Sequence, residues 1–73
     1  MLYRLIITKV KKGYYLGTSF NGIKYKVHSN NHIGTYKVGY DVSFYANKKV
    51  GFFKDTLIPI SDEEAGVRLI NNL

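Results

Sequence analysis

An Asn-Gly pair, Asn21-Gly22, is the feature that most constrains the fold of this chain, because it stands between two strand-like runs. Both residues tolerate a positive φ, which a two-residue type I′ turn requires at both central positions. The pair therefore predicts a β-hairpin in which Phe20 lies opposite Ile23. Counting outward from this pair sorts the side chains into two faces. The apolar face takes Leu16, Thr18, Tyr25 and Val27, and the polar face takes Tyr15, Gly17, Ser19, Lys24, Lys26 and His28.

Alternation of apolar and polar residues, broken by Gly, Asn and Lys-rich turns, predicts five strands over residues 2–10, 14–20, 23–28, 40–46 and 50–58. Residues 29–37 are rich in loop formers and give the one long connection, while Pro59 ends the last strand. A chain of 73 residues has room for one domain. The sequence thus predicts a mainly β fold, a small five-stranded antiparallel closed barrel over residues 1–60. The oligonucleotide-binding (OB) and SH3-like barrels are both candidates, and the place of the long connection favours the OB type.

A short C-terminal α-helix is predicted over residues 61–73. Ser61 and Glu64 have the spacing of a capping box, in which each residue can satisfy a free amide of the other. Ala65, Leu69 and Leu73 then fall on one stripe, which we expect to pack on the barrel. The alternative is that this stripe contacts a partner protein or a second copy of the chain.

The charge balance points to a polyanionic partner. The chain has 11 Lys and Arg against 5 Asp and Glu, a net charge of +6, and nearly all of the basic residues precede residue 61. Lysines attract phosphates and release their condensed counterions on contact, so a basic body of this kind is typical of proteins that bind RNA or DNA. The alternative is a basic surface that serves only solubility.

Three short motifs resemble those of known nucleic-acid-binding domains. Residues 13–16 (GYYL) with 27–29 (VHS) resemble the S1 RNA-binding domain, and residues 12–14 (KGY) with the same Val-His resemble cold-shock domains. Residues 37–44 (KVGYDVSF) resemble the entry to the fourth strand in both families, so the resemblance covers about residues 3–58. It implies an OB barrel and places Tyr15 and His28 at the family positions of a stacking aromatic and a histidine. Lys26 stands where cold-shock domains usually have a third stacking aromatic.

These observations predict a binding surface on the second and third strands. A tyrosine ring offers a stacking platform for any base, and lysines two residues apart on one strand match the step between phosphates. We therefore expect single-stranded nucleic acid, RNA more than ssDNA, to bind with low sequence specificity. The predicted binding residues are Lys12, Tyr15, Lys24, Lys26 and His28, with Lys54 on the fifth strand. Phe52 and Phe53 could add a stacking position, although we expect at least one of them to be in the core.

The sequence offers no motif for catalysis. It contains no cysteine, no nucleophile elbow and no phosphate-binding glycine loop, and Asp41 and Asp55 have no reason to act as an acid–base pair. We expect no enzymatic activity, no cofactor, no metal site at His28 and His32, and no small-molecule substrate. Without an apolar run of membrane-spanning length, a cytoplasmic location is expected. The rival hypothesis is a small regulatory module that binds a protein or forms a homodimer through the C-terminal helix.

Overall fold

The computed structural model describes residues 1–66, and this part of the chain contains five strands. Their bounds are β1 (Leu2–Lys11), β2 (Tyr14–Thr18), β3 (Lys24–His28), β4 (Asp41–Lys49) and β5 (Asp55–Pro59). The predicted mainly β class and the number of strands are confirmed. One predicted turn is wrong: residues 47–49 continue β4, because they pair with residues 56–58 of β5. The β4–β5 loop instead spans residues 50–54.

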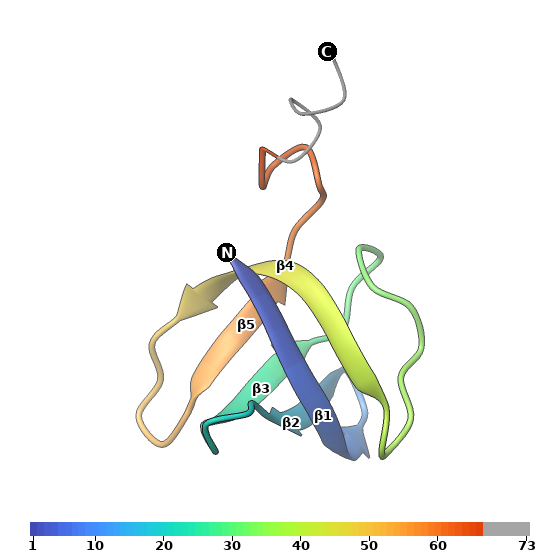
Figure 1. Cartoon of the computed structure of the whole chain (residues 1–73), viewed down its shortest axis with the longest axis vertical. Coiled ribbons are helices and arrows are strands. Elements are labelled where there is room, and N and C mark those ends of the chain that lie inside the picture. The colour runs from blue at the N-terminus through green and yellow to red at the C-terminus, as the bar shows by residue number, and fades with distance from the viewer. Residues whose placement is uncertain (67–73) are drawn as a thin grey trace.

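The strands close into a barrel in the order β1-β2-β3-β5-β4 (Figure 1). All neighbouring pairs are antiparallel except β3 and β5, which are parallel, so the prediction of a wholly antiparallel barrel is wrong. The parallel pair arises because residues 29–40 cross one end of the barrel between β3 and β4. The chain then returns through the β4–β5 hairpin to lie beside β3. This strand order, with its long third connection, fits an OB-like fold.

The β2–β3 register differs by one residue from the predicted one. Tyr15 pairs with Val27 and Leu16 with Lys26, whereas the sequence placed Tyr15 opposite His28. The cause is the turn, in which three residues, 20–22, lie between the paired Ser19 and Ile23. Only Gly22 has a positive φ (82°), as in a three-residue loop that ends in a left-handed glycine. The slip turns every β2 side chain to the other face.

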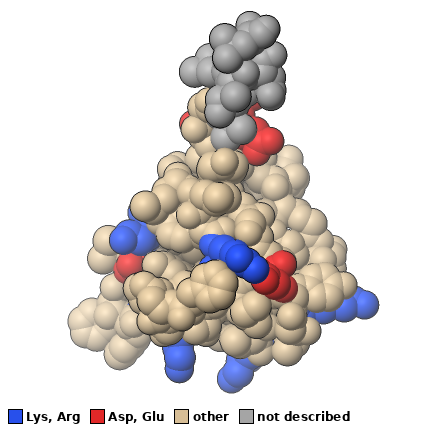
Figure 2. Space-filling view, in the orientation of Figure 1, with Lys and Arg blue, Asp and Glu red and all other residues tan. Residues whose placement is uncertain are grey.

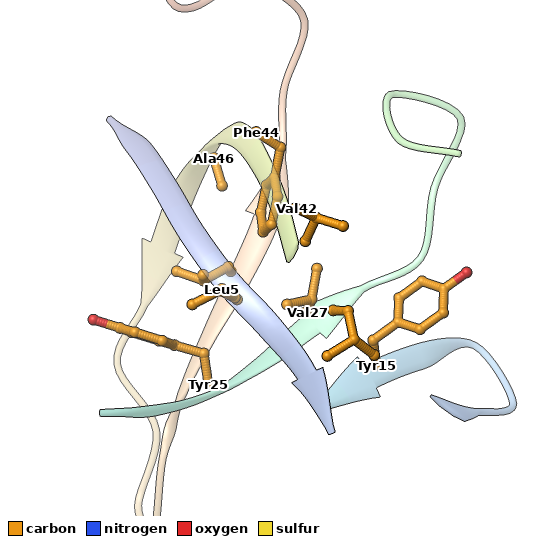
Figure 3. Close-up of a cluster of buried hydrophobic side chains, with 9 residues drawn as sticks. Leu5, Tyr15, Tyr25, Val27, Val42, Phe44 and Ala46 are labelled. Atoms are coloured by element: carbon orange, nitrogen blue, oxygen red, sulfur yellow. The ribbon is translucent and has the colours of Figure 1, made fainter. Parts of the chain in front are cut away.

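The new register places Tyr15 inside the barrel, where it is only 6% exposed (Figure 3). Its ring lies 5.2 Å from that of Tyr36, and its hydroxyl accepts a hydrogen bond of 3.2 Å from the Tyr36 backbone amide. Gly17 also faces inward, where an added Cβ would lie 3.2 Å from both the Ile6 carbonyl oxygen and the Leu5 Cβ. The inward side of β2 therefore alternates a large ring with a glycine that permits close approach to β1.

The core is built from inward residues of all five strands (Figure 3). Val27 and Leu57 are fully buried on the parallel pair, and the predicted alternation of β4 is confirmed by the buried side chains of Val42, Phe44 and Ala46. Tyr36 and Ile33 from the long connection pack against this core. The connection thus covers one end of the barrel without any helix of its own.

A bulge in β1 decides which of its side chains face outward. Ile7 pairs with Gly17 and Lys9 with Leu16, so Thr8 is the extra residue between them. Before the bulge, Leu5 and Ile7 point into the core. After it, Lys9 and Lys11 pair with outward residues of β2 and share their face. Without the extra residue, strict alternation would direct both lysines towards the core.

The predicted C-terminal helix is not found in its described part, where residues 62–66 form turns. The Ser61 hydroxyl accepts a hydrogen bond of 3.1 Å from the Glu64 amide, as a capping residue does. Gly66 has a positive φ of 81°, a conformation typical of the residue that follows a helical turn. Leu69, Ile70 and Leu73 of the predicted stripe lie outside the described residues. No helix long and apolar enough to span a membrane occurs within residues 1–66.

Candidate nucleic-acid interface

The outer surface of the barrel carries a row of side chains that crosses all five strands. Successive ladder partners in this row are Lys9, Leu16, Lys26, Thr56 and Lys49. Three lysines therefore alternate with two uncharged residues along the row. Neighbouring strands lie about 4.8 Å apart. Lys24 and His28 flank Lys26 on the same side of β3. We call this surface, with the β4–β5 loop, the basic face.

An aromatic ring lies directly beside the central lysine of the basic face. Tyr14 pairs with His28 across the β2–β3 ladder and is half-buried. The Lys26 Nζ atom lies 4.4 Å from the centre of the Tyr14 ring, which is within the range of a cation–π contact. Tyr14 therefore has the position that the sequence analysis gave to Tyr15.

A groove of about 410 Å³ runs between β3 and the β4–β5 loop. Lys26 and His28 form one wall, and Lys49 with the backbone of the loop forms the other. Thr56 and Ile58 of β5 also line it, so the groove contains one hydroxyl and an apolar side chain between the basic walls.

The β4–β5 loop, whose Val50 and Gly51 line the groove, also carries two exposed rings. Phe52 is 94% exposed and Phe53 91%, and the rings meet edge to face with centres 4.8 Å apart. The expectation that one of them is in the core is wrong, because the loop begins after Lys49 and carries both away from the barrel. Two phenylalanine rings on one loop expose apolar surface to water, which is unfavourable unless a ligand covers it. They are therefore candidates for ligand contact.

Asp55 closes this loop at its base. One carboxylate oxygen accepts a hydrogen bond of 3.1 Å from the Gly51 amide, and the other lies 3.8 Å from the Lys48 ammonium. At Gly51 any side chain would overlap the backbone carbonyl of Lys54. The loop conformation therefore depends on a glycine and a carboxylate.

The lysines of the basic face have no carboxylate partner within the described part of the chain. Ion pairs there join Arg4 to Asp41 and Lys48 to Asp55, and the His32 Nε2 atom lies 4.0 Å from a Glu64 carboxylate oxygen. The lysines outside these pairs on the basic face and its edges are Lys9, Lys11, Lys12, Lys24, Lys26, Lys49 and Lys54. In the view of Figure 2, acidic side chains of the barrel lie against basic ones, whereas basic side chains at the lower edge stand alone.

Four of the six predicted site residues share this region. Lys24, Lys26 and His28 project outward from β3 as predicted, and Lys54 lies at the end of the β4–β5 loop. Lys12 lies in the β1–β2 turn, next to Lys11, the ladder partner of Tyr14. Tyr15 lies in the core and not on this surface.

The sequence did not predict Tyr14, Lys49 or the exposure of both phenylalanines on this surface. The predicted β2–β3 register was wrong by one residue, so Tyr14 was placed on the opposite face. The predicted turn after β4 began three residues too early, so Lys49 was not placed in a strand. The bulge at Thr8 directs Lys9 and Lys11 to the basic face, and no sequence pattern predicted this bulge.

No set of metal ligands accompanies these residues. Within residues 1–66, no three His, Cys, Asp or Glu side chains lie close enough to hold one ion. His32 instead lies 4.0 Å from a Glu64 carboxylate oxygen.

The strand order and the outer surface define a small OB-like β-barrel with one basic, aromatic face. Searches against protein-family models, curated proteins and solved structures gave no match for this chain.

Proposed function

We propose that this protein binds single-stranded nucleic acid, RNA in preference to ssDNA, along the basic face. The observation that carries the proposal is the groove between β3 and the β4–β5 loop. Unpaired lysines line both of its walls, and the loop that borders it carries two exposed phenylalanines. The preference for RNA comes from the resemblance to S1 domains. An OB-like barrel commonly binds oligonucleotides on this part of its surface.

The chemistry of the groove suits a phosphate backbone and stacked bases. Lys26 and Lys49 reach it from opposite walls, so a strand that follows the groove has cations on both sides. Phe52 and Phe53 offer rings on which bases stack, and each stacked base contributes about 1–3 kcal/mol whatever its identity. The polar side chains that line the groove are two lysines, one imidazole and one hydroxyl, with no side-chain amide or carboxylate, which agrees with low sequence specificity.

The contact between Lys26 and Tyr14 adds a step to binding. In the free protein, the ammonium lies over the ring face on which a base would stack. A base that stacks on Tyr14 displaces the ammonium, and the phosphate next to that base gives the ammonium a new partner. The two side chains therefore act together. Loss of the ring removes the stacked base and loss of the ammonium removes the phosphate contact, so either loss weakens binding.

Fluorescence anisotropy with labelled oligouridine, oligodeoxythymidine and a duplex tests the proposal. We expect single strands to bind more tightly than the duplex. If Lys24, Lys26, Lys49 and Lys54 each contact a phosphate, affinity falls roughly 50-fold between about 50 and 200 mM salt, from a slope of about −0.7 per contact. Absence of binding to any single strand at low salt contradicts the proposal.

The double variant Lys26→Gln, Lys49→Gln locates the contacts. It should reduce the magnitude of the salt slope by about 1.4, because two phosphate contacts are lost. Lys37→Gln is the matched control, since Lys37 is an exposed lysine of the β3–β4 connection that does not line the groove. An equal loss in both variants would mean that general charge, and not this groove, attracts the ligand.

A further inference from the structure

A second groove, of about 400 Å³, lies over the first half of β1. Its lining includes Arg4, Ile6, Thr18, Phe20 and Asp41, and its exposed lining is mainly apolar. β1 forms ladders with β2 and β4 and none with β3 or β5. This groove therefore lies on the other side of the barrel from the groove of the basic face. We call it the neutral face.

The charges of the neutral face cancel each other. The Arg4 guanidinium donates two hydrogen bonds to Asp41, from Nε at 2.9 Å and from a terminal nitrogen at 2.7 Å. This fork holds the pKa of the Asp41 carboxyl below its ordinary value, so the pair stays ionised and neutral overall. No lysine lines the groove.

An aromatic ring projects at the edge of the same groove. Phe20, at the tip of the β2–β3 turn, is 85% exposed and makes a cation–π contact with Arg4 at 4.9 Å. Ile6 is also partly exposed within the groove, and Ile23 follows in the same turn. A hollow and an apolar projection thus lie side by side on one face. That arrangement is self-complementary under a two-fold axis, since each copy can place its projection in the hollow of the other.

We propose that the neutral face binds a second copy of this chain, with the Phe20 ring of each copy in the β1 groove of its partner. Charge decides which face a second copy can bind. Two copies with a net charge of +6 repel each other wherever their free lysines meet, and this face combines a cancelled ion pair with apolar surface. In the two-fold arrangement, Arg4 of each copy also approaches Asp41 of the other. The proposal does not depend on nucleic-acid binding, and the groove beside β3 stays open on each copy of the dimer.

Sedimentation equilibrium of the full chain without nucleic acid tests the proposal. A small interface gives a weak dimer, which we expect to become populated at about 100 µM and above. Phe20→Glu should raise the dissociation constant at least about tenfold, because it removes the ring and places two carboxylates near the axis. Phe52→Glu is the matched control, since Phe52 is an equally exposed phenylalanine on the other loop, and it should leave association unchanged. Circular dichroism checks that each variant keeps its fold.

A charge exchange between two variants gives the sharper result. Arg4→Asp puts two carboxylates on the face and Asp41→Arg puts two guanidinium groups there, so each variant alone should stay monomeric. When the two are mixed, opposite charges meet and a heterodimer should form. A monomeric wild-type chain at about 1 mM, or no heterodimer on mixing, overturns the proposal. Association abolished by Leu69→Glu but not by Phe20→Glu would also overturn it, because the interface would then lie in the C-terminal segment.

Discussion

The basic face and the neutral face share the same small barrel and differ in what happens to their charges. On the neutral face, Arg4 and Asp41 form a two-point ion pair and leave no net charge. On the basic face, Asp55 lies at the base of the β4–β5 loop, and its oxygens are engaged by Lys48 and the Gly51 amide. The lysines around the groove therefore stay without counter-charges. The position of two aspartates, more than the number of lysines, separates a surface suited to polyanions from one suited to self-association.

β1 contributes to both faces and shows how the separation is built. Its residues before the bulge at Thr8 supply Arg4 and Ile6 to the neutral face, and those after it supply Lys9 and Lys11 to the basic face. One extra residue thus allows a single strand to serve two surfaces of different character.

The two adjacent tyrosines of β2 test this division most strongly. Tyr15→Ala should destabilise the fold by about 3–5 kcal/mol, comparable to loss of other large core rings and a large part of the stability of a domain this small. Tyr14→Ala should change the unfolding free energy little and reduce nucleic-acid affinity about 5- to 150-fold. Urea denaturation and anisotropy measure the two effects. If Tyr15→Ala stays folded and loses binding, the register described above is wrong.

Phe20 and Phe52, one exposed phenylalanine from each face, give a reciprocal comparison of the faces. Phe52→Ala should weaken oligonucleotide binding by about 1–3 kcal/mol, because one stacking ring is lost, and leave self-association unchanged. Phe20→Ala should have the opposite pattern. Anisotropy and sedimentation on both variants complete the comparison. A variant that changes both properties would show that the two faces are coupled or are one surface.

A smaller effect is expected from the long connection, which contributes to neither groove of the comparison. Burial, with a further contribution from nearby Tyr15, raises the pKa of Tyr36 above its ordinary value of 10.0. The unfolded chain therefore loses this proton first, and stability should fall as the pH rises through about 10 and above. Tyr36→Phe should flatten that alkaline decline in the free energy of unfolding. Equal declines in both proteins would show that Tyr36 is as readily ionised in the fold as in the unfolded chain.

Much of the fold could be predicted from the sequence because strand alternation depends on local pattern. The alternation of β3 and β4 is clear in the sequence, and Lys24, Lys26 and His28 do project outward. The inward side of β2 was not predictable from pattern alone. Tyr14 and Tyr15 are chemically identical, and the choice between them depends on a turn one residue longer and on the Tyr36 amide that pairs with the Tyr15 hydroxyl.

The site was harder to predict because it depends on pairings between distant strands. Lys9, Lys26 and Lys49 are far apart in the sequence and come to lie along one row through the β1 bulge, the parallel β3–β5 pair and the longer β4. None of these three features has a strong local signal. The parallel pair follows only from the closure of the whole barrel.

Amide chemical-shift titration of the full chain with a short oligouridine tests most directly whether the basic face binds single-stranded nucleic acid. The account predicts shifts that cluster at Tyr14, Lys26, His28 and residues 50–58, while the amides of Ile6 and Phe20 stay unchanged when the spectra are recorded at a fixed low protein concentration. Shifts confined to the neutral face, or no shifts at low salt, would contradict it.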